Sequence, residues 1–335
     1  MQSRSPKKRE AFTSADHDSV SILRIEKTEK IATHWQGAMW KIFACLCFAA
    51  VNGVVRYISG GSGGMENPLA PYQIVLLQNV FGSLIMIPWI ARKGGLVSLK
   101  TKRPLLHMVR VMSAVLGVIL WYFSLSYMNI ATAVALAFTG PIFTIIGAKI
   151  YLGEHIGTKR MVAISIAFFG TFLIMRPDRV LLSPKANMDL SVFLPLLSAI
   201  FIAVSKLTAR DLGASGEPPR VLTTYLLFLM VPVSAIPAFI GWVNPTLHQW
   251  GWLAILGILG TLAHLSTAKA LSLAGVTFLN PFGFSRLVLS GIIGFMAFQE
   301  VPNSANFWIG LSVIIFSVSL MMWDTKDRLG RGIDI

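Results

Sequence analysis

The feature that most constrains this chain is a succession of apolar stretches, each about 20 residues long, separated by short polar segments. An α-helix needs about 20 mostly apolar residues to cross the hydrocarbon core of a bilayer. Charged residues make up only 13% of the 335 residues, against about 25% in soluble domains. The sequence therefore predicts an all-α membrane protein with ten transmembrane helices, at residues 37–59, 70–91, 104–127, 130–152, 161–176, 189–209, 220–243, 249–273, 276–298 and 303–323.

Basic residues are distributed unevenly between the loops, and the formal net charge is +14. They gather in the N-terminal tail, in the loop RKGGLVSLKTKR and after the last span, whereas the loops GGSGGMENPLA and QEVPN carry none. The stretch 177–188 is an exception, with Arg179 and Lys185. Because basic loops stay on the cytoplasmic side, we expect a multi-pass protein of the cell inner membrane with both termini in the cytoplasm. Its surroundings are lipid, and no nucleic-acid partner is expected.

The N-terminal segment, residues 1–36, is polar and has no apolar region of the kind found in signal peptides. We interpret it as a mobile cytoplasmic tail. The two cysteines, Cys45 and Cys47, lie inside the first span, where they act as small apolar residues. The sequence thus predicts no disulfide framework, no metal site and no cofactor.

The chain carries a weak internal repeat. Shifting the sequence by 146 residues places Ser126 on Ser272 and Glu154 on Glu300, and a shift of 150 places Arg56 on Lys206. Residues 37–176 and 189–323 would be the two repeats, joined by a linker at 177–188 and followed by a cytoplasmic tail at 324–335. Because five spans is an odd number, the second repeat would be inverted, as in many secondary transporters.

Two long segments resemble a known family. The segment ATAVALAFTGPIFTIIGAKIYLGE and the segment LNPFGFSRLVLSGIIGFMAFQE resemble the first-half and second-half signatures of the drug/metabolite transporter superfamily, in its EamA branch. The resemblance covers residues 38–323, and within the branch it points to bacterial members that include S-adenosylmethionine uptake carriers. It implies a transporter. The chain departs from the pattern at Gln78, because many relatives carry an arginine before the residue equivalent to Asn79.

One cation lies deep in a predicted span. Arg286 is about ten residues from the cytoplasmic start of the ninth span, roughly 15 Å into the membrane. Pro281 interrupts that span, and Gly140 and Pro141, beside Thr139, interrupt the fourth span at the mirrored position. Broken helices that meet at the midplane form the substrate sites of many transporters. We therefore expect Arg286 to face a water-filled cavity and to contact the substrate.

Other residues join this candidate site. Trp121 and Tyr122 are either packing aromatics or the wall of a cavity on which a planar or cationic group stacks. The full set of substrate-binding candidates is Arg286, Trp121, Tyr122, Thr139, Gln78, Asn79, Arg110 and Phe284.

Charges near the span ends have two interpretations. The pairs Arg56–Glu300 and Lys206–Glu154 could be gates that open alternately, or the two carboxylates could simply be solvated at the headgroups. Three lysines near predicted cytoplasmic ends are expected to extend to the membrane surface, namely Lys41, Lys149 and Lys269.

The function that these residues favour is a secondary carrier for a small metabolite. Its interior charges are cationic, which favours a substrate with a carboxylate or another anionic group, such as an amino acid or an S-adenosylmethionine-like molecule. No Asp or Glu lies in mid-span, so facilitated diffusion or exchange is favoured over a carboxylate proton relay. The alternatives are a membrane enzyme of the acyl- or glycosyltransferase type, for which no paired base is found, and a membrane scaffold. The carrier would be a monomer or a homodimer.

Overall fold

The structure is a computed structural model that describes residues 7–61, 64–92, 101, 103–153, 158–175, 190–217, 219–273, 279, 281–300 and 305–330. These residues contain helices and turns and no strand. The helices are α1 (Lys7–Ile58), α2 (Pro71–Arg92), α3 (Pro104–Tyr127), α4 (Ile130–Ala137), α5 (Gly140–Leu152), α6 (Thr158–Met175), η2 (Leu190–Val192), α8 (Phe193–Ala214), α9 (Pro219–Ile240), α10 (Leu247–Leu273), η3 (Pro281–Phe284), α12 (Ser285–Phe298) and α13 (Ala305–Gly330).

These helices account for the apolar pattern of the sequence. Each of the ten predicted spans overlaps a helix of the described residues. By length and composition, six helical segments in this part of the chain can cross a membrane, and three shorter helices are also apolar. The protein is therefore an all-helical, multi-pass membrane protein, and ten crossings remain a prediction.

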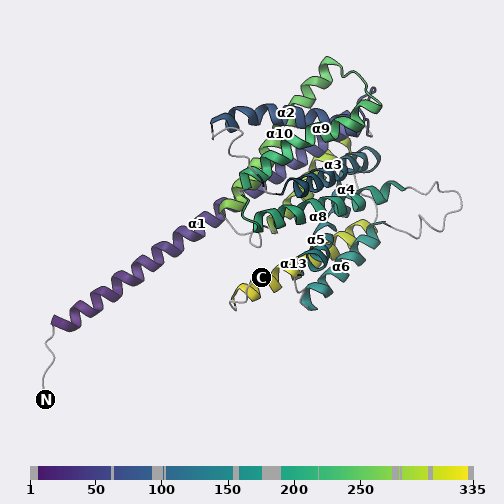
Figure 1. Cartoon of the computed structure of the whole chain (residues 1–335). Helices are drawn as coiled ribbons and strands as arrows, with labels where there is room; N and C mark the ends of the chain where they lie inside the picture. Colours follow the sequence, from purple (N-terminus) through teal and green to yellow (C-terminus); the bar gives the residue numbers. More distant parts are fainter. Residues whose placement is uncertain are drawn as a thin grey trace.

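The longest helix, α1, differs from the prediction for the N-terminal tail. Its backbone is helical from Lys7, where the sequence predicts a mobile segment. A helix is costly to nucleate but cheap to extend, so the first membrane span can continue into the polar segment before it. At 52 residues, α1 is about 78 Å long and extends far beyond the rest of the bundle (Figure 1).

The fourth and ninth predicted spans are both interrupted. Phe138 and Thr139 separate α4 from α5, and the 3₁₀ turn η3 precedes α12. A proline ring clashes with the carbonyl of the residue four positions earlier and removes one backbone donor. For Pro141 that residue is Ala137, at which α4 ends. The break thus follows directly from the sequence.

The bundle is held together by contacts between helices that are distant in sequence. Helix α1 packs against α10 and α12, α3 packs against α8 and α9, and α6 packs against α13 (Figure 1). Small residues let membrane helices approach closely, as α6 and α13 do. A Cβ atom added to Gly170 would lie only 2.8 Å from the carbonyl oxygen of Gly310. A large cluster of buried apolar residues lies between α1, α2, α3, α4 and α10.

Candidate functional site

The candidate site centres on Arg286, in the first turn of α12. Its Cζ atom lies 5.0 Å from the ring centroid of Phe48 and 5.5 Å from that of Trp121. Its Nη2 donates to Oδ1 of Asn52 over 3.5 Å, and its Nε is buried without a hydrogen-bond partner in the part of the chain that the structure describes. Among the described residues, no carboxylate forms an ion pair with it. The guanidinium is therefore positioned by aromatic rings and an amide, and no described carboxylate neutralises its charge.

Asn52 organises the residues around this arginine. It is fully buried in α1. Its Oδ1 accepts a hydrogen bond from Nε1 of Trp121 at 3.2 Å, and its Nδ2 donates to Oγ of Ser290 at 3.3 Å. An unsatisfied amide would be costly at this depth, so these bonds fix the relative positions of α1, α3 and α12. Asn52 is not among the residues predicted from the sequence, although a lone amide in mid-span is itself a signal of a polar interior.

A second polar pair lies beside this group. The hydroxyl of Tyr122 donates to Oε1 of Gln78 and interacts electrostatically with Arg286. The Gln78 amide lies against α10, because a Cβ atom added to Gly260 would be only 2.5 Å from its Nε2. The structure thus brings Arg286, Trp121, Tyr122 and Gln78 into one region, as a substrate site would require.

Two further polar side chains lie on the inward faces of their helices. Lys206 and His264 are both exposed. Nine residues before each of them is an exposed apolar residue, Leu197 in α8 and Ile255 in α10. Nine residues make about two and a half helical turns, so Lys206 and His264 lie on the opposite face of their helices from these apolar residues. Buried neighbours, such as Ala203 beside Lys206, share the inward face. Both residues are therefore exposed to the interior of the bundle. The His264 ring meets the Phe48 ring edge-on, with 5.5 Å between the ring centroids.

The structure corrects the interpretation of Lys41. The sequence analysis expected it to extend to the membrane surface. It instead shares one face of α1 with Cys45, Phe48 and Asn52, at the spacing of four, seven and eleven residues that brings side chains onto one side of a helix. Its charge interacts electrostatically with Lys206. The rotation of α1, which is set by packing against α10 and α12, turns this lysine inward.

The residues that the sequence analysis paired as one gate are in contact. Arg56 and Glu300 form an ion pair in which their side chains are only 3% and 5% exposed. Nη1 of Arg56 also donates to the carbonyl oxygens of Leu125 and Met128, at 2.6 and 2.7 Å. Glu300 Oε2 accepts from the backbone N–H of Ile130 at 2.8 Å. A carboxylate is favourable at a helix N-terminus, so this cluster ties α1, α3, α4 and the end of α12 together.

The remaining candidates lie elsewhere or are not described. Thr139 and Asn79 are buried. Thr139 donates a hydrogen bond to the carbonyl oxygen of Leu136, and Asn79 donates to that of Val75. Arg110 is also buried and donates to the carbonyl of Leu222 in α9. Glu154 and the side chains of Pro141, Pro281 and Phe284 lie outside the described residues, so the pair Lys206–Glu154 stays a prediction.

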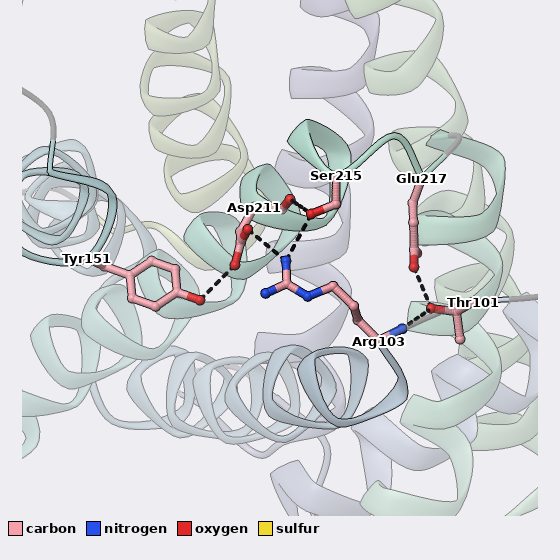
Figure 2. A network of polar contacts seen from close by, with 6 residues as sticks. All are labelled: Thr101, Arg103, Tyr151, Asp211, Ser215 and Glu217. Carbon is pink, nitrogen blue, oxygen red and sulfur yellow. Dashed lines mark hydrogen bonds and ion pairs between the residues drawn. The ribbon is translucent and has the colours of Figure 1, made fainter.

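A polar network lies at the end of the bundle for which the charge distribution predicts a cytoplasmic location (Figure 2). Nη1 of Arg103 donates to Asp211 and to Ser215, both at 2.9 Å, and the Tyr151 hydroxyl donates to the other oxygen of Asp211 at 2.8 Å. Thr101 bonds to Glu217, which also pairs with His107 of α3. The network connects the start of α3 with the ends of α5 and α8. None of the residues in it was a candidate for the substrate site.

Comparison with known proteins gives three findings. The sequence profile of the EamA-like transporter family matches residues 35–176 and 189–323. A riboflavin transporter of Vibrio cholerae is 32% identical to this chain, over 87% of this chain and 94% of the relative. An S-adenosylmethionine uptake transporter of Rickettsia bellii is 24% identical, over 91% of this chain and 99% of the relative. A protein of known crystal structure has the same fold, with a TM-score of 0.56, 17% identity, and coverage of 87% of this chain and 95% of its own.

Proposed function

Because this chain belongs to the EamA-like transporter family, whose relatives named above are transporters and not enzymes, we propose that it carries a planar, flavin-type metabolite across the membrane. The family match confirms the resemblance seen in the signature segments, and transport of a small metabolite replaces the alternatives of membrane enzyme and scaffold. The identification of the cargo as a flavin is the more specific part of the proposal. It is supported by the site and by the riboflavin transporter that is 32% identical to this chain.

The observation that carries this proposal is the Arg286 guanidinium, which is held over two aromatic rings and has no carboxylate partner among the described residues. A planar heterocycle can stack on such rings. Its carbonyl oxygens and ring nitrogens can accept hydrogen bonds from the guanidinium N–H groups. The buried Nε of Arg286, which has no hydrogen-bond partner among the described residues, is a donor that a bound acceptor would satisfy.

The charges of the region weigh against an S-adenosylmethionine-type cargo. That molecule carries a sulfonium and an ammonium group against one carboxylate, so it is cationic. The interior already contains Arg286, Lys206 and Lys41, and Lys206 interacts electrostatically with the other two. A cation would meet like charges there, whereas a neutral or anionic heterocycle would not. A carboxylate or other anionic group on the cargo remains compatible with this site.

Transport would proceed by alternating access between two inverted five-helix repeats. The buried Arg56–Glu300 cluster supports a closed outer end, and the inward exposure of Lys206 and His264 supports water access to the interior. In this proposal the outer cluster must separate when the site opens outward. We place the protein in the cell inner membrane with both termini in the cytoplasm.

The test measures uptake of radiolabelled riboflavin into membrane vesicles, normalised to folded protein, together with quenching of flavin fluorescence by the purified protein. We expect Arg286→Ala to weaken binding by about 10- to 100-fold, because one or two hydrogen bonds to a charged group are lost. Arg286→Lys should recover little, because lysine cannot reproduce the planar fork of donors. The control is Lys269→Ala, at an exposed lysine on the outward face of α10. Parental uptake by Arg286→Ala would refute the proposal.

A further inference from the structure

A group of three cations lies on the inward faces of three helices. They are Lys41 of α1, Lys206 of α8 and Arg286 of α12, and Lys206 interacts electrostatically with both of the others. Lys206 is exposed although Ala199 and Ala203, on the same face of α8, are buried. The two lysines thus border the same interior space as the arginine.

Three of the described carboxylates form ion pairs with other side chains. Glu300 is occupied by Arg56 and Ile130, Asp211 by Arg103, and Glu217 by His107. Three like charges that border one interior space repel one another. An anion that enters this space would stabilise them, whereas Arg286 alone suffices for the acceptors of a neutral ring. The two lysines therefore favour a cargo that carries a negative charge, which riboflavin itself lacks.

We propose that Lys41 and Lys206 form an anion subsite beside the ring site of Arg286, and that it takes the phosphate of a phosphomonoester cargo. A phosphate carries a charge of about −1.5 to −2 at pH 7 and three strong acceptor oxygens. Lysine ammonium groups bind phosphate as point charges. The inference rests on the proposed function for the identity of the ring, but the subsite itself can be tested without any flavin.

The experiment compares the affinities of riboflavin and its 5′-phosphate ester for the purified protein, by flavin fluorescence quenching in detergent without added lipid. We expect the phosphate ester to bind at least tenfold more tightly. Lys206→Gln should weaken binding of the ester about tenfold, because one charged contact to phosphate is lost. It should change the affinity for riboflavin by less than twofold. Lys206→Arg should keep most of the preference for the ester. Lys269→Gln, the same substitution on the outward face of α10, should change neither affinity.

Inorganic phosphate and anionic phospholipid complete the test. Millimolar inorganic phosphate should compete with the ester but not with riboflavin, and it should raise the melting temperature of the parental protein but not of folded Lys206→Gln. If anionic phospholipid instead displaces the ester at micromolar concentration while inorganic phosphate does not, the subsite holds a lipid headgroup and the cargo proposal is overturned. If riboflavin binds and the ester binds no better, the subsite is wrong and the proposed function stands. If neither flavin binds, the proposed function fails, and the inorganic phosphate result alone decides the subsite.

Discussion

Replacing Asn52 by aspartate should neutralise Arg286, the proposed substrate contact, without disturbing the packing around it. The two side chains have nearly the same shape. The new carboxylate can still accept from Nε1 of Trp121, as the Asn52 Oδ1 does, and its other oxygen can accept from the rotatable hydroxyl of Ser290, which now receives the amide. What changes is the charge next to Arg286.

The size of the effect follows from the distance of 3.5 Å between Nη2 of Arg286 and Oδ1 of residue 52. Two unit charges at that distance attract by roughly 5 kcal/mol at an effective dielectric constant of about 20. Desolvation of the carboxylate offsets part of this attraction, and a net hydrogen bond to a charged group is worth about 1.5–3 kcal/mol. A ligand that needs the free guanidinium must overcome this amount, so its affinity should fall by about 10- to 150-fold.

The assay is flavin fluorescence quenching with purified Asn52→Asp, supported by uptake in vesicles and by a thermal melt. We expect weaker binding together with an unchanged or raised melting temperature. The control is Asn67→Asp, the same substitution at an exposed position of the loop after α1, which should bind as the parent does. Parental affinity in a folded Asn52→Asp protein would show that Arg286 does not contact the ligand.

Three further predictions concern the fold and its gate. Glu300→Gln should lower the free energy of unfolding by about 3 kcal/mol, because it leaves the Arg56 charge buried and unpaired; adding Arg56→Gln should recover most of it, and additive effects in a thermal-melt cycle would contradict the pairing. Gly170→Ala should destabilise the protein by about 1–3 kcal/mol through the clash with α13, while Gly291→Ala, which meets nothing within 4 Å, should melt as the parent does. Reporters fused to the C-terminus and to the loop after α1 should lie in opposite compartments, and a shared compartment would refute the ten-span topology.

Much of this architecture could be read from the sequence because it depends on local properties. Hydropathy located the helices, since each span must satisfy its backbone polar groups by itself in lipid. Pro141 marked the break that ends α4 at Ala137, because the clash that causes it reaches back only four residues. The two signature segments indicated the family, which the profile match confirms.

Only the tertiary structure decided what those residues meet. Asn52 and Arg286 are 234 residues apart, and no local pattern shows that their helices pack together. Lys41 illustrates the reason most clearly. A lysine near the end of an apolar helix has the same sequence signal whether it reaches the headgroups or faces the interior. The choice depends on the rotation of the helix about its own axis, which is fixed by packing against its neighbours and not by the sequence of the helix itself.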